Sequence, residues 1–117
     1  MENYVIVRPQ HLNHNGHLFG GQTLQWIDEF SWIAATIEFP GNKFVTKYIG
    51  EASFNRGIPL GAIVKFDINM KRKGITSVTY QCDVYIVDDK PENREPVFSS
   101  PITFTAVGDD GHRTAIK

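Results

Sequence analysis

The sequence contains little cysteine and no long apolar run. Its single cysteine, Cys82, can form no internal disulfide and no cysteine zinc site by itself. No stretch approaches the ~20 apolar residues that cross a bilayer, and no secretory signal peptide is recognisable. The formal net charge is −1, so we expect no broad basic surface for nucleic acid. These absences predict a cytoplasmic protein without membrane segments or nucleic-acid partners.

The length of 117 residues is typical of one domain, which we expect to span residues 1–117. Hydrophobic residues make up 41% of the chain and charged residues 21%, close to globular averages, so a disordered chain is excluded. A domain of this size buries only about two-thirds of its unfolded surface. We therefore expect a deep ligand site to need a second copy of the chain.

One long helical pattern comes before a series of strand patterns. Apolar residues spaced for one helix face predict a helix over residues 21–39, ended by Pro40 and Gly41. One expected apolar stripe consists of Trp26, Phe30, Ile33 and Ile37, and a second stripe beside it consists of Leu24, Ile27, Ala34 and Ala35. The helix is therefore expected to be mostly buried, with close approach of a neighbour at the two small alanines.

Apolar and polar residues then alternate over residues 64–71 and 78–86, which predicts two strands joined as a hairpin. Weaker patterns predict further strands, at residues 4–7, 44–54 and 98–106. Pro101 lies inside the last of these, so that strand is expected at a sheet edge or beside a bulge. Because strands joined by short turns are antiparallel, the fold class is predicted to be α+β, with a curved antiparallel sheet wrapped around one long buried helix.

The candidate chemistry lies around the start of the helix. Gly20 and Gly21 expose backbone N–H groups at a helix N-terminus, where partial positive charge suits an oxyanion or a phosphate. Asp28 follows two turns later and could activate a water aimed at a carbonyl. From these residues alone, a flexible glycine entry and a solvent-facing Asp28 remain open. A metal site on the preceding loop also remains open, built from His11, His14 and His17.

Residues 13–29 carry the most specific pattern. They read N-x-x-G-x-x-F-G-G-x-x-L-x-x-x-D-E, which resembles the signature of the hotdog-fold acyl-CoA thioesterases of the acyl-CoA hydrolase branch. Later motifs match in the same order: V-T at 45–46, F-x-R-x-x-x-x-G at 54–61, K-G-x-T-S-V at 73–78 and F-x-A-V at 104–107. The chain departs from the family pattern at Gly57, where proline is usual, at Ala62 and at His17.

The resemblance implies a hotdog fold in which two subunits pair edge to edge, with active sites at their interface. Asp28 would be the catalytic carboxylate, as general base or nucleophile, and Asn13 of the opposite subunit would orient the water or the thioester. The N–H groups near Gly20 and Gly21 would polarise the thioester carbonyl. Because a sulfur leaving group departs easily, no metal and no cofactor is implied, coenzyme A being part of the substrate. The implied partners are an acyl-CoA substrate and at least one further copy of the chain, as a homodimer or a higher homo-oligomer.

Coenzyme A carries a pyrophosphate and a 3′-phosphate, which cationic side chains recognise. The candidate coenzyme A-binding residues are Arg56, Lys71, Arg72, Lys73 and Ser77. The basic run from Lys71 to Lys73 is interpreted equally well as the solvated end of a hairpin.

Two other functions remain open. A hotdog module could bind acyl-CoA or an acyl carrier without catalysis, although it would need neither Asn13 nor Asp28. A hotdog dehydratase would use a catalytic histidine with a carboxylate, but no such pattern surrounds the helix. Cys82 alternates with apolar neighbours and is predicted to be a buried hydrophobe rather than a nucleophile.

Overall fold

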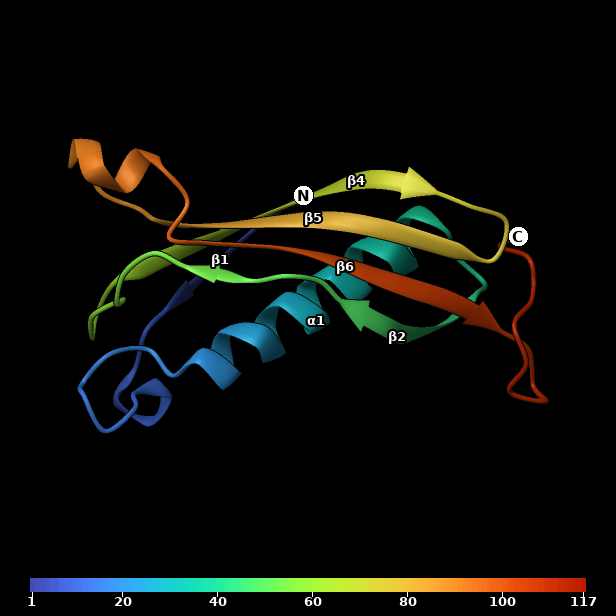
Figure 1. Ribbon diagram of the computed structural model, residues 1–117, viewed down its shortest axis with the longest axis horizontal. Coiled ribbons are helices and arrows are strands. Elements are labelled where there is room, and N and C mark those ends of the chain that lie inside the picture. The colour runs from blue at the N-terminus through green and yellow to red at the C-terminus, as the bar shows by residue number, and fades with distance from the viewer.

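One helix lies across a single antiparallel sheet in the computed structural model, which describes residues 1–117 (Figure 1). The elements are β1 (Glu2–Ile6), η1 (Pro9–His11), α1 (Gly20–Glu38), β2 (Lys43–Ile49), β3 (Ser53–Phe54), β4 (Ile63–Lys73), β5 (Ser77–Ile86), η2 (Pro91–Arg94) and β6 (Phe98–Val107), where η marks a short 3-10 turn. The strand order is β1-β4-β5-β6-β2, with β3 paired to β6, so β1 and β2 form the two edges. The predicted α+β arrangement of one helix and an antiparallel sheet is confirmed. No helix combines the length and the apolar character needed to cross a bilayer.

The helix begins and ends within one residue of the predicted limits. Its last turn is closed by the N–H of Phe39, which donates to the carbonyl of Ala35 at 2.8 Å. The side chain of Asn42 then donates to the carbonyl of Phe39 at 2.9 Å. Gly41 adopts a φ of 83°, a region that glycine enters without the Cβ penalty, so the chain can turn sharply towards β2 here.

The buried face of α1 follows the second predicted stripe, at Ile27, Ala34 and Ala35, rather than the first. Its fully buried residues are mostly small: Thr23, Ile27, Ser31, Ala34 and Ala35. Trp26 and Phe30 lie beside this face and pack edge-on against Phe66 of β4, with ring centroids 5.9 and 5.2 Å apart. Ile37 is 68% exposed, so its predicted burial is wrong. Small side chains allow the helix to approach the sheet closely, and the larger ones therefore pack beside the contact.

The predicted β4–β5 hairpin is present, with Phe66 opposite Val84 and Ile68 opposite Cys82. Pro101 does not lie at a sheet edge, because β6 runs between β5 and β2 and its pairing with β5 is continuous through Pro101. The other predicted setting, beside a bulge, is confirmed, because the neighbouring strand takes four steps from Ile49 to Ser53 where β6 takes three from Ile102 to Ser99. The predicted strand 44–54 is divided into β2 and β3 at this position, where the N–H of Gly50 donates to the carbonyl of Pro101 at 2.8 Å. The missing proline N–H therefore faces the gap between β2 and β3 and breaks no ladder bond.

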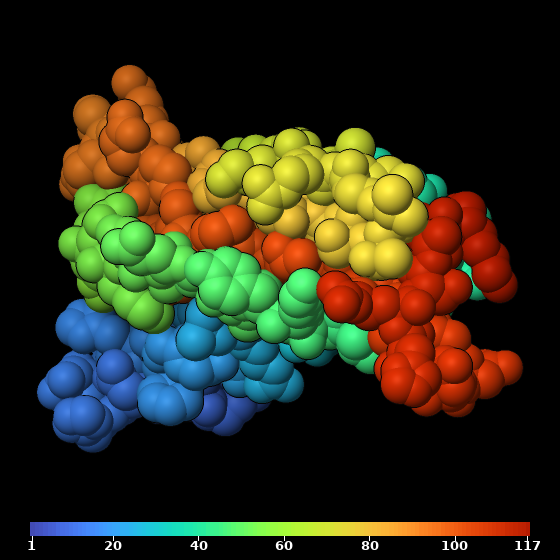
Figure 2. Space-filling view, turned by 45° about the vertical axis from the view of Figure 1, so that its right-hand side comes forward, coloured from blue at the N-terminus to red at the C-terminus, as the bar shows by residue number.

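Loops that are distant in sequence gather at one end of the sheet. The N–H of Leu18, just before α1, donates to the carbonyl of Ile58 in the β3–β4 segment at 2.8 Å. In Figure 2 this pre-helix loop (blue) lies next to the β3–β4 segment (green), with the η2 turn (orange) beyond. The β4–β5 hairpin and the C-terminus lie at the other end (Figure 1). The N-terminus of α1 therefore sits among three converging loops.

Candidate active site

Asp28 is held by a threonine from the neighbouring edge strand. The Oγ1 of Thr46 on β2 donates to Asp28 Oδ1 at 2.6 Å, while Asp28 Oδ2 accepts no hydrogen bond. The two residues line a groove of about 230 Å³ together with Gln25, Glu29 and Trp32. The carboxylate is therefore fixed through one oxygen and free to accept a proton through the other. Thr46 was not predicted as a site residue, although it belongs to the V-T motif at residues 45–46.

The two glycines at the start of α1 make room for aromatic rings. A Cβ on Gly21 would lie 2.4 Å from Phe19 Cε1, and one on Gly20 would lie 3.3 Å from Phe54 Cζ. Neither glycine N–H donates a hydrogen bond within the chain, because the first intrahelical bonds come from Gln22 and Thr23 to the carbonyl of Phe19. Both glycines thus lie against aromatic rings, and they leave two free donors at the positive end of the helix.

Asn13 is locked into a turn by its own side chain. Its Oδ1 accepts the N–H of Asn15 at 2.9 Å and that of His17 at 3.2 Å, and its own N–H donates to the carbonyl of His17 at 2.7 Å. Gly16 completes the turn with a φ of 79°. Two backbone donors fix which carboxamide atom is the oxygen. The Nδ2 group of Asn13 makes no hydrogen bond in the chain and is free to donate.

Asn13 and Gly20 line a second groove of about 260 Å³, which Phe54 and Arg56 also border. This groove and the one over Asp28 share no lining residue. The structure therefore brings Asn13 to the helix N-terminus but does not bring it to Asp28 within one chain. That separation is compatible with the prediction that these two residues meet across two subunits.

The predicted coenzyme A-binding residues fall into two groups. Arg56 borders the Asn13 groove, and its guanidinium donates to the Glu92 carbonyl at 2.7 Å and to the side chain of Asn93. It thereby fastens the β3–β4 segment to η2. The remaining four residues lie at the opposite end of α1, where the β4–β5 hairpin places Lys71, Arg72, Lys73 and Ser77. One chain does not bring the two groups together.

The three histidines of the pre-helix loop do not converge. His11 Nδ1 accepts the N–H of Arg8 at 2.9 Å, and its ring packs edge-on against Trp26 with centroids 4.8 Å apart. His17 instead lies over Gly57, where a Cβ would come within 2.8 Å of His17 Cδ2. No group of three or more His, Cys, Asp or Glu side chains is placed to hold a metal ion. His17 and Gly57, the two residues that depart from the family pattern in this region, are thus in direct contact.

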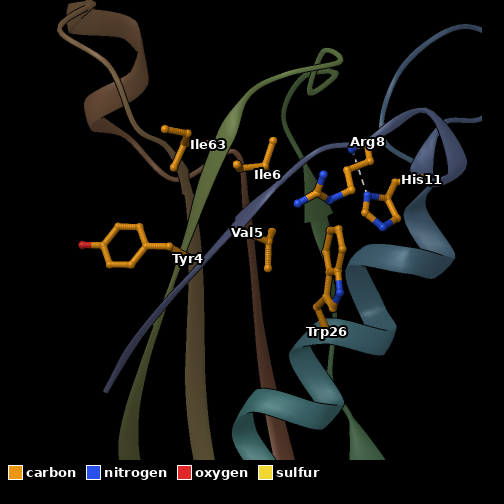
Figure 3. Close-up of a pocket in the computed structure, with 7 residues that line it drawn as sticks. All are labelled: Tyr4, Val5, Ile6, Arg8, His11, Trp26 and Ile63. Carbon is orange, nitrogen blue, oxygen red and sulfur yellow. Dashed lines mark hydrogen bonds between the residues drawn. The ribbon is translucent and has the colours of Figure 1, made fainter.

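The largest cavity, about 600 Å³, lies between β1 and the N-terminal half of α1 (Figure 3). Its lining residues are Tyr4, Val5, Ile6, Arg8, His11, Trp26 and Ile63. Figure 3 shows Arg8, His11 and Trp26 grouped on the helix side, whereas Tyr4 points away from them. None of the predicted catalytic or coenzyme A-binding residues lines this cavity, and it contains no carboxylate. We therefore place the candidate reaction site at the two smaller grooves.

Two buried titratable groups lie outside both grooves. The hydroxyl of Tyr80 donates to Glu38 Oε1 at 2.8 Å, and burial followed by this contact raises the pKa of Tyr80 well above its usual range. Burial, with a smaller effect from Asp83, raises the pKa of the Cys82 thiol to about 12. A thiol with this pKa is almost wholly protonated near neutral pH, which confirms the interpretation of Cys82 as a buried hydrophobe.

A family profile described as the thioesterase superfamily matches residues 15–92. The chain is 27% identical to mouse acyl-coenzyme A thioesterase 11 over 79% of its own length, and spans about a fifth (19%) of that protein.

Solved structures are similar over almost the whole chain. The Staphylococcus aureus acyl-CoA hydrolase, in complex with butyryl coenzyme A, coenzyme A and coenzyme A disulfide, has a TM-score of 0.86 and 27% identity, covering 99% of this chain and 70% of its own. A hexameric hotdog fold thioesterase of Campylobacter jejuni has a TM-score of 0.84 and 24% identity, with 98% and 88% covered. The predicted hotdog fold is therefore confirmed.

The Staphylococcus aureus enzyme has also been solved as three single alanine mutants, of an aspartate, a threonine and an asparagine. These are the residue types of Asp28, Thr46 and Asn13. In that enzyme the asparagine precedes the aspartate by the same number of positions as Asn13 precedes Asp28.

Proposed function

The chain belongs to the thioesterase superfamily, and we propose that it hydrolyses acyl-CoA thioesters to a free carboxylic acid and coenzyme A. The observation that carries this proposal is the Thr46–Asp28 hydrogen bond, which leaves one carboxylate oxygen free beside an open sheet edge. The free N–H groups of Gly20 and Gly21 supply the complementary donors. A base and an oxyanion site are the two parts that thioester hydrolysis requires.

Asp28 is proposed to act through its free Oδ2. As general base, Oδ2 takes a proton from water, whose oxygen then attacks the thioester carbonyl carbon. When the tetrahedral intermediate collapses, the C–S bond breaks and the thiolate takes the proton back from Asp28. As nucleophile, Oδ2 would attack the same carbon, and the C–S bond would break to release the coenzyme A thiolate and leave a mixed anhydride. Water would then hydrolyse the anhydride to the free acid and Asp28, and the proton left on Asp28 would pass to the thiolate. Thr46 orients the carboxylate in either case.

Asn13 is proposed to act as a hydrogen-bond donor to the substrate. Its Oδ1 is already occupied by the N–H groups of Asn15 and His17, so it has little capacity left to accept from a water. Its free Nδ2 could instead donate to the thioester carbonyl oxygen, where negative charge develops. Together with Gly20 and Gly21, Asn13 would then form the oxyanion site.

The complete active site is proposed to need two copies of the chain. Asn13 and Asp28 line separate grooves in one chain, and the Asp28 groove lies against β2, whose outer side has no partner strand. Unpaired edge strands are templates for further pairing. If β2 pairs with β2 of a second copy about a twofold axis, opposite ends of the two helices come together. Relatives described as hexameric support a homo-oligomer, and the β2–β2 pairing is part of the proposal.

The same symmetry suggests how coenzyme A could be held. Arg56 lies near the N-terminus of α1, and the basic hairpin lies near its C-terminus. Antiparallel pairing of two copies would place Arg56 of one copy near Lys71, Arg72, Lys73 and Ser77 of the other. Each substrate would then meet phosphate-binding groups from both chains.

A thiol-release assay with acyl-CoAs of several chain lengths tests the proposed activity. We expect hydrolysis by the wild-type chain and loss of most of it in Asp28→Asn, which keeps the side-chain shape and removes the base. Full activity of Asp28→Asn would exclude Asp28 as base or nucleophile. Binding of acyl-CoA in titration calorimetry without any turnover would instead favour a non-catalytic binding module.

A further inference from the structure

Trp32 extends the wall of the Asp28 groove. It follows Asp28 by one helical turn, so the two side chains share a face of α1 about 6 Å apart along the axis. The indole Nε1 donates to the carbonyl of Phe44 on β2 at 3.3 Å, which fixes the ring in place. The side chain nevertheless remains 43% exposed and lines the groove with Asp28 and Thr46.

The groove is chemically asymmetric. Trp32 is its one hydrophobic lining residue, and no basic side chain lines it. Glu29 lies next to Asp28, and two carboxylates repel the phosphates of coenzyme A. An apolar acyl group, in contrast, can cover the indole face. With the thioester carbonyl at Asp28, the acyl chain is therefore the part of the substrate that lies against Trp32.

We propose that Trp32 is a specificity-determining residue that closes the acyl end of the groove and restricts the enzyme to short acyl chains. This inference rests on the proposed function. An acyl chain that starts at Asp28 reaches the fixed indole after about one helical turn, roughly 6 Å, the length of a few methylene groups. Longer chains would have to displace a ring held by the Phe44 carbonyl or leave the groove into water.

The other tryptophan of α1 serves a different purpose. Trp26 packs against Phe66 and His11 and lines the cavity beside β1, with no part in the Asp28 groove. Ile37 offers a matched control, because it is a large exposed apolar residue of the same helix that does not line the groove.

The test is a chain-length profile of kcat/KM, from acetyl- to palmitoyl-CoA, for the wild type and for Trp32→Ala, Trp32→Phe and Ile37→Ala. We expect the wild type to favour short chains. Trp32→Ala should raise the ratio of kcat/KM for lauroyl-CoA to that for butyryl-CoA by about tenfold or more, a typical selectivity for a remodelled apolar pocket. Trp32→Phe should change this ratio much less, because a ring remains, and Ile37→Ala should leave it unchanged.

Size-exclusion chromatography of each variant separates selectivity from assembly. An unchanged ratio in an active, normally assembled Trp32→Ala would overturn the inference. So would equal loss of activity on every chain length together with dissociation, since Trp32 would then be an assembly residue. If the wild type hydrolysed no acyl-CoA at all, the proposed function itself would fail, which is a distinct result.

Discussion

Thr46 Oγ1 and Asp28 Oδ1 lie 2.6 Å apart and join the edge strand β2 to the middle of α1. The contact joins two elements that are separated in sequence by the second half of the helix and a tight turn. It is the one side-chain hydrogen bond that Asp28 makes, so the orientation of the carboxylate depends on it.

Thr46→Val should therefore weaken catalysis without unfolding the chain. Valine keeps the shape and the strand preference of threonine but removes the donor. Hydrogen bonds to charged groups contribute about 1.5–3 kcal/mol, so we expect kcat to fall about 10- to 100-fold. Steady-state kinetics provide the measurement, and Thr46→Ser, which restores the hydroxyl, is the control. Equal loss in the serine and valine variants would show that the hydroxyl is not what matters.

Asn13→Asp should separate the two roles of Asn13, which are to hold the turn through Oδ1 and to donate a hydrogen bond to the substrate through Nδ2. The carboxylate can still accept the N–H groups of Asn15 and His17, so the turn and the melting temperature should be preserved. The Nδ2 donor is lost, and removal of an oxyanion donor typically lowers kcat about 10²- to 10³-fold. Asn69→Asp adds the same charge on an exposed position of β4 that lines neither groove, and it should leave kcat nearly unchanged. Comparable kcat in the two variants would argue against a donor role for Asn13.

Gly57→Ala should lower stability and activity, and a second substitution, His17→Ala, should restore them. The added Cβ would lie 2.8 Å from His17 Cδ2 and 2.9 Å from His17 Cγ. Overpacking of this kind costs about 1–3 kcal/mol, and a shift of His17 would also disturb the turn that holds Asn13. We expect lower unfolding free energy in denaturant titrations and lower kcat. The double variant with His17→Ala should recover most of both, whereas equal losses in the two backgrounds would mean that the ring contact is not the cause.

The Cys82 thiol should not react with the reagent used in a thiol-release assay. Its pKa of about 12, raised mainly by burial, keeps it protonated at assay pH, and its position inside the sheet excludes reagent. A chromogenic disulfide reagent at pH 8 should detect no thiol in the folded protein and one per chain in guanidinium. Rapid reaction of the folded protein would show that this part of the sheet opens easily.

Elements with a strong local pattern could be predicted from the sequence, whereas contacts between distant segments could not. The period of apolar residues located α1 to within one residue and identified the β4–β5 hairpin. The burial of Ala34 and Ala35 was predicted, but the burial of Ser31 and the exposure of Ile37 were not, because the close approach of helix and sheet favours small side chains over large ones. That preference depends on tertiary packing, which a single helical pattern does not report.

The candidate site also divides into residues that a local motif predicts and residues whose role depends on contacts between distant segments. Asp28, Asn13 and the glycine pair follow from the motif at residues 13–29, all within one continuous segment. Thr46 was missed as a site residue because its role depends on how β2 lies against α1, 18 positions after Asp28. The bonds of Arg56 to η2, 36 and 37 positions away, depend equally on the folded loops.

Mixing Asn13→Ala with Asp28→Asn shows whether two chains build one thioesterase site, on which the proposed mechanism depends. Each variant alone should be nearly inactive on acyl-CoA. In a mixed dimer, one site combines both defects and the other has the intact Asn13 and the intact Asp28. After equimolar mixing with full subunit exchange, we expect recovery of about one quarter of wild-type kcat, since about half of the dimers are mixed and each has one intact site. If mixed dimers verified by native mass spectrometry showed no recovery of activity, Asn13 and Asp28 would not share a site across two chains.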